Sequence, residues 1–178
     1  DNAIAWVQLG KNASSKRKGK SFVAGYIPTQ ANPSGLSQIN NHLVVANLES
    51  PAYFQRPYLP APEVMLSDMI FNIDRATWDL FNGSGRWRGL DLVSVANNHS
   101  LDQGMDGLEA TLDFLRSQQV AYAGASRSGS DEESAPVLDR NGIRLGFVGA
   151  TFSLNKGVIP PGFEAYCQVV RMNEPNAD

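Results

Sequence analysis

The sequence is poor in three features that assign many proteins to a class directly: paired cysteines, long hydrophobic runs and an excess of basic residues. It contains one cysteine, Cys167, so no disulfide can form within the chain. No hydrophobic run approaches the ~18 residues that a membrane-spanning helix needs. Lysines and arginines number 15 against 18 aspartates and glutamates, and the net charge of −3 disfavours nucleic acid as a partner. What remains is 178 residues, 42% of them hydrophobic, a composition typical of one globular domain.

The first forty residues are rich in Ser, Asn, Gly and Pro, and they predict little regular structure beyond one short strand at residues 3–9. We therefore expect residues 11–40 to form an irregular, basic and polar entry segment. Five cations lie between Lys11 and Lys20. Such a run is typical of a solvated loop, and contact with a polyanion is the alternative.

The rest of the chain alternates between strand and helix patterns. Nearly continuous apolar runs at residues 42–48 and 90–95 predict buried strands. Residues 105–118 predict a helix, because four apolar side chains recur three and four positions apart. These are Met105, Leu108, Leu112 and Leu115. A strand at residues 120–123 would complete a parallel β-α-β crossover.

Two further elements complete the predicted architecture. Residues 74–81 predict a short helix, and residues 136–139 and 143–151 predict a hairpin around the Asn-Gly turn at Asn141. The expected fold class is therefore α/β, with a mixed, mostly parallel sheet flanked by helices.

Polar side chains gather where two of the predicted strands end. They are Asn47 and Glu49 after the first buried strand, and Asn97, Asn98, His99 and Asp102 after the second. Ligands of open α/β sheets bind beyond the carboxyl ends of parallel strands, so these side chains should face one another. Carboxylate and amide oxygens suit Mg²⁺ or Mn²⁺, and an imidazole extends the range to Zn²⁺ or Fe.

The candidate residues can be interpreted as functional or as structural. Glu49 can anchor a cation, Asn98 can lend its amide oxygen, and His99 can donate a proton. However, asparagine is also a common turn residue, and Asp102 suits the positive end of the helix that follows. The residues alone leave both interpretations open.

Three segments resemble a known family. They are residues 47–51 (NLESP), 94–104 (SVANNHSLDQG) and 107–112 (GLEATL). Their order and spacing are similar to those of the CapA family of poly-γ-glutamate capsule biosynthesis proteins, and the similarity extends over residues 43–151. The family is similar in fold to the calcineurin-like metallophosphoesterases.

The resemblance implies a single domain over residues 1–178 that corresponds to the N-terminal half of a four-layer metallophosphoesterase-like sandwich. It implies that Asn98 and His99 match the metal-binding asparagine and the catalytic histidine of those enzymes. Glu49 and Asn47 then become candidate metal ligands, and Asn97 and Asp102 supporting residues. Two departures stand out. The family has an Asp after its first strand where Lys11 stands here, and its later histidines would follow Asp178. We therefore expect an incomplete two-metal site.

The function implied by the resemblance is capsule or poly-γ-glutamate biosynthesis outside the cytoplasm, at the cell surface or in the periplasm. The expected partners are an anionic polymer such as poly-γ-glutamate and other capsule-synthesis proteins. The alternatives are a metal-dependent phosphoesterase-type hydrolase using Mn, Mg, Zn or Fe, and a non-catalytic domain that binds an anionic polymer. Whether the chain is an enzyme stays open.

Overall fold

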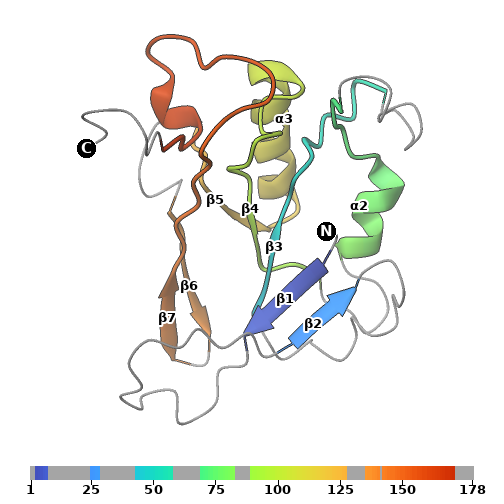
Figure 1. Ribbon diagram of the computed structural model, residues 1–178. Coiled ribbons are helices and arrows are strands. Elements are labelled where there is room, and N and C mark those ends of the chain that lie inside the picture. The colour runs from blue at the N-terminus through green and yellow to red at the C-terminus, as the bar shows by residue number, and fades with distance from the viewer. Residues whose placement is uncertain are drawn as a thin grey trace.

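A computed structural model describes the fold over most of the chain. The described residues are 3–7, 25–28, 43–57, 69–82, 89–127, 135–140 and 142–170. Five strands form one sheet in the order β2-β1-β3-β4-β5 (Figure 1). Their bounds are β2 Gly25–Pro28, β1 Ala3–Val7, β3 Leu43–Asn47, β4 Leu92–Ser94 and β5 Ala121–Ala123.

The parallel part of the sheet matches the prediction. Strand β4 pairs in parallel with β3 on one side and with β5 on the other, and helix α3 (Gly104–Ser117) connects β4 to β5. Leu108, Leu112 and Leu115 of α3 are buried, and Met105 packs against them from the rim. The predicted apolar stripe therefore faces the core, and the α/β class with a mixed sheet is confirmed.

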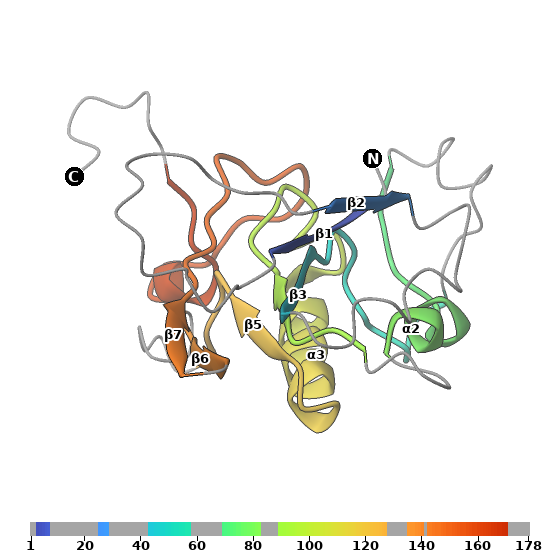
Figure 2. The ribbon, with the colours of Figure 1, turned by 90° about the horizontal axis from the view of Figure 1, so that it is seen from below.

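Helix α2 (Arg75–Phe81) extends the core on the same side as α3. Figure 2 shows the two helices together on one side of the strands. The indole of Trp78, which is 1% exposed, meets the ring of Phe114 at a centroid distance of 5.1 Å. The helix begins where the sequence predicts, because Asp74 accepts a hydrogen bond from the Thr77 amide at 3.0 Å as its N-cap.

The predicted hairpin forms but does not join the main sheet. Within the described part of the chain, strands β6 (Val137–Arg140) and β7 (Ile143–Gly146) pair only with each other, and Gly142 in their turn has φ 77°. The expected strand at residues 143–151 was too long, because pairing ends at Gly146. Thr151 instead forms an isolated bridge with Val169. The antiparallel strands of the mixed sheet are β1 and β2.

The N-terminal strand runs against the direction of the parallel strands. Val7, at the end of β1, pairs with Leu43 at the start of β3. The chain therefore leaves β1 at the edge of the sheet opposite to Glu49. Strand β2 lies within the segment predicted to be irregular, so that prediction was wrong for residues 25–28. Lys11 and its neighbours lie outside the described residues.

Candidate functional site

The turn between β4 and α3 is fixed by hydrogen bonds of its own. The Ser100 hydroxyl accepts the Asn97 amide at 2.8 Å, and it lies 2.6 Å from the carbonyl oxygens of Val95 and Asn97. The Asp102 amide donates to the His99 carbonyl at 3.0 Å. Four side chains of the turn are buried, so the turn packs as part of the core. They are Asn97, His99, Ser100 and Asp102.

Asn97 joins this turn to the segment that follows β3. Its Nδ2 donates to the Leu48 carbonyl at 2.8 Å and to Asn47 Oδ1 at 3.2 Å, while its Oδ1 accepts the His99 amide at 3.0 Å. The two polar clusters therefore meet at one edge of the sheet, as expected for neighbouring parallel strands. The prediction that Glu49 and His99 share this edge is confirmed.

His99 and Asp102 form a buried pair at the centre of the turn. His99 Nδ1 lies 2.7 Å from Asp102 Oδ2, with side chains 5% and 0% exposed. The same oxygen accepts the Phe71 amide at 2.6 Å, and the Phe71 ring stacks on the imidazole at 4.0 Å. A carboxylate can only accept, so His99 carries its proton on Nδ1 and leaves Nε2 for other partners.

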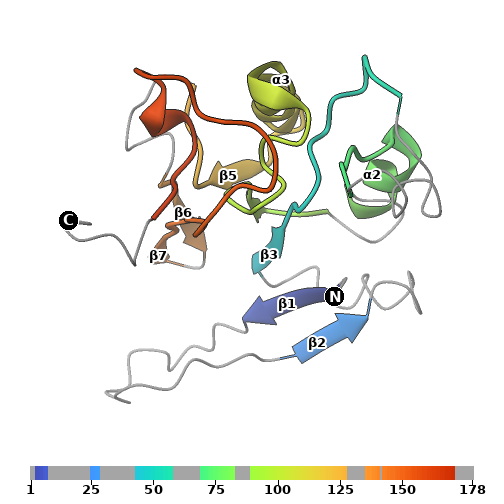
Figure 3. The same cartoon turned by 45° about the horizontal axis from the view of Figure 1, so that its top comes forward.

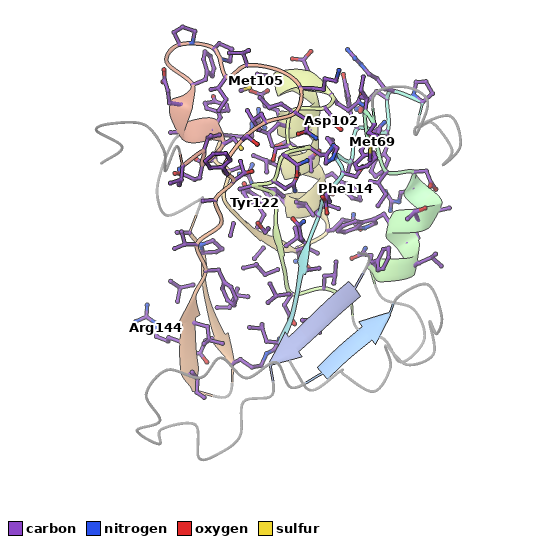
Figure 4. The ribbon with its side chains drawn as sticks, in the orientation of Figure 1. Met69, Asp102, Met105, Phe114, Tyr122 and Arg144 are labelled. Carbon is purple, nitrogen blue, oxygen red and sulfur yellow. The ribbon has the colours of Figure 1, made fainter. Side chains whose placement is uncertain are left out.

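This arrangement differs from the helix-dipole role expected for Asp102. The N-cap of α3 is Gln103, and its side chain makes no capping hydrogen bond. The Asp102 carboxylate points to His99 instead, and its Oδ1 has no hydrogen-bond partner within the described part of the chain. Figure 4 shows Asp102 where many side chains converge beyond the ends of β3 and β4, whereas Arg144 stands apart on the hairpin.

The predicted metal ligands are more exposed than the buried side chains of the turn. Asn47 and Glu49 are exposed, with Asn47 Nδ2 3.3 Å from Glu49 Oε2, and Asn98 is partly exposed. Their oxygens are donors that hard divalent cations accept. Over the described residues, however, no three His, Cys, Asp or Glu side chains gather closely enough to hold a metal ion. These oxygens suit a divalent cation in kind, and their role as metal ligands stays a prediction.

Two residues that the sequence analysis missed also contact His99. Phe71 follows a proline-rich stretch of the sequence and belongs to no motif. Asn155 comes from the segment after the hairpin, where its amide donates to the Asn98 carbonyl at 2.8 Å and its Nδ2 lies 3.4 Å from His99 Nε2. Figure 3 shows this segment, in orange-red, crossing beside the turn that precedes α3. An Asn-x-Gly pattern at residues 155–157 was the available signal.

A largely apolar hollow of about 720 Å³ lies on the other side of that segment. Its lining includes Leu154, Val158, Glu164 and Cys167, and it does not include the polar side chains around His99. Cys167 is fully buried. Burial raises the pKa of its thiol, and a hydrogen bond with Ser100 acts in the opposite direction. The hollow therefore lies next to the His99 site and does not contain it.

Fold and site together define an α/β domain with a His–Asp pair at the carboxyl edge of its parallel strands. The family model described as bacterial capsule synthesis protein PGA_cap matches residues 26–176. The chain belongs to this family, and its function is in capsule biosynthesis, a process of the cell envelope. A comparison with curated proteins found no match. In the described residues, no helix has the length and apolar character needed to cross a membrane.

Proposed function

We propose that the chain serves capsule synthesis by binding the capsule polymer beyond the carboxyl ends of β3 and β4, and that His99 contacts the polymer. The observation that carries this proposal is the buried pair of His99 and Asp102 at 2.7 Å. Burying the Asp102 carboxylate costs several kcal/mol of desolvation free energy, and a turn that only had to reverse the chain would need neither this carboxylate nor the imidazole beside it. The pair also lies beyond the carboxyl ends of parallel strands, where α/β sheets bind their ligands.

Each residue of the pair has its own part in this proposal. Asp102 holds Nδ1, and Phe71 stacks on the ring, so the imidazole cannot rotate freely. Nε2 is the nitrogen that remains to exchange a hydrogen bond or a proton with a ligand. The ligand we expect is an anionic polyamide of the poly-γ-glutamate type, which presents both carboxylates and amide groups.

The proposal also includes a divalent cation of which the protein would supply only some of the ligands. Glu49, Asn98 and Asn47 would hold it through their oxygens, and it would supply positive charge against the carboxylates of the polymer. His99 and Asp102 act on the polymer through the contacts described above. We further propose that this takes place outside the cytoplasm, at the cell surface or in the periplasm, alongside other capsule-synthesis proteins.

The test is the affinity of the chain for fluorescent poly-γ-glutamate, measured by anisotropy with Mn²⁺ and with EDTA. His99→Ala should weaken binding about fivefold, since Nε2 accepts a hydrogen bond from an amide N–H of the polymer and a neutral hydrogen bond contributes ~0.5–1.5 kcal/mol. The control is Arg144→Ala, which removes an exposed charge from the remote hairpin and should change affinity by about twofold or less. Equal losses in the two variants would show that binding is non-specific and would refute the proposal.

A second measurement separates binding from hydrolysis. We expect negligible turnover of bis-p-nitrophenyl phosphate with Mn²⁺, because a two-metal hydrolase needs several ligands on each ion. Robust hydrolysis that is lost in His99→Ala, without any polymer binding, would establish the metal-dependent hydrolase instead.

A further inference from the structure

Asn155 reaches His99 from a segment that is 56 residues away in the sequence. Its backbone amide donates to the Asn98 carbonyl at 2.8 Å, which secures it to the turn. Its side-chain Nδ2 then lies 3.4 Å from Nε2 of His99. The one ring nitrogen that Asp102 leaves available therefore already has a neighbour.

The segment around Asn155 is held in place at both ends. The Thr151 amide donates to the Gln168 carbonyl and the Thr151 carbonyl accepts the Val170 amide, both at 2.8 Å. On the other side, Gly157 has φ 74°, and a Cβ there would lie 3.0 Å from Leu101 Cβ. This close approach requires glycine, and it fixes how near Asn155 comes to the turn.

The hydrogen-bond donors and acceptors decide what Asn155 does. The side-chain nitrogen of Asn155 can only donate, so Nε2 of His99, which it faces at 3.4 Å, accepts through a lone pair. The amide N–H₂ group of Asn155 is a donor, so it covers that lone pair. A separation of 3.4 Å is long for a hydrogen bond, and a ligand group with better geometry can replace it.

We propose that Asn155 is a positioning residue of the His99 site: its amide caps Nε2 in the free protein and is displaced when a ligand takes that nitrogen. This role rests on the proposed function of His99. The cap keeps the ring in the orientation that Asp102 and Phe71 define. It also keeps Nε2 out of contact with water, since the whole residue is 4% exposed.

The first experiment measures the reactivity of Nε2 without any polymer. Diethyl pyrocarbonate modifies the free imidazole nitrogen, and mass spectrometry separates His99 from His42, the other histidine of the chain. Asn155→Ala should raise the modification rate of His99 about fivefold, as expected for the loss of one net hydrogen bond. Asn155→Ser, with a shorter side chain, should show a rise in the same direction.

The matched control is Ser153→Ala, which removes an exposed side chain from the same segment without touching His99. It should leave the rate unchanged, and circular dichroism should show that all three variants are folded. If Asn155→Ala and Asn155→Ser modify as slowly as Ser153→Ala, Asn155 does not cap Nε2 and the inference is wrong.

Binding of poly-γ-glutamate tests the displacement step separately. Since the cap leaves when the ligand binds, Asn155→Ala should bind the polymer as tightly as the unsubstituted chain or more tightly, by up to about fivefold. A loss as large as that of His99→Ala would make Asn155 a ligand contact and overturn the displacement. Failure of the polymer to protect His99 from the reagent in the unsubstituted chain would instead count against the proposed function.

Discussion

Asn97 should be the residue of the site whose loss costs the most stability. Asn97→Ala removes three hydrogen bonds and leaves the Leu48 carbonyl and the His99 amide without their partner. An unsatisfied buried group costs ~1–3 kcal/mol, and the Leu48 carbonyl can recover part of this from water. We expect the free energy of unfolding to fall by about 2–4 kcal/mol, a large part of the ~5–15 kcal/mol of a typical domain.

The assay is urea unfolding followed by circular dichroism. With a slope of ~2 kcal/mol per molar urea, the midpoint of Asn97→Ala should fall by about 1–2 M. Asn97→Asp is a second variant: it still accepts from the His99 amide but cannot donate to the Leu48 carbonyl, so it should be at least as unstable.

The matched control is Asn98→Ala, the same substitution at the partly exposed neighbour, which should stay within ~0.5 kcal/mol. If the unfolding midpoints of Asn97→Ala and Asn98→Ala coincide, Asn97 does not join the two strand ends energetically. The reasoning about this edge of the sheet would then be refuted.

Three further predictions concern packing, the thiol and a helix cap. Gly124→Ala should cost more than about 2 kcal/mol, because Gly124 has φ 91° and a Cβ would lie 2.4 Å from a neighbouring side chain; Gly142→Ala, with φ 77° and open space, is the control and should cost only ~1–2 kcal/mol by thermal unfolding. Cys167 should react slowly with a thiol reagent at neutral pH, because burial raises the pKa of its thiol, and fast only in urea; rapid labelling of the native chain would contradict its burial. Asp74→Ala should cost ~1 kcal/mol at neutral pH. Hydrogen bonds from Thr77 lower the pKa of Asp74 below its usual 3.8, so the stability difference should shrink as pH falls below that value, and a constant difference down to pH ~2 would exclude the cap.

Much of the fold was predictable because its signals are local. The apolar runs before residues 47 and 95 and the stripe along α3 express the periods of strand and helix, and these hold wherever the elements pack. The Asn-Gly turn of the hairpin and the N-cap at Asp74 likewise depend on neighbouring residues. The placement of Glu49 and the His99 turn at the same edge of the sheet followed from one topological rule about parallel strands. The roles of Glu49, Asn47 and Asn98 as metal ligands stay predictions.

The amino-acid sequence was therefore enough to predict the β-α-β unit, the family and the polar edge with His99 at its centre. It did not predict the direction of β1, the separation of the hairpin from the main sheet, or the approach of Phe71 and Asn155 to the imidazole. These features depend on contacts between segments that are distant in the sequence. Pairing direction and side-chain approach depend on free-energy differences between packed arrangements of segments far apart in the chain, and no local pattern of residues records which arrangement buries more surface and satisfies more hydrogen bonds.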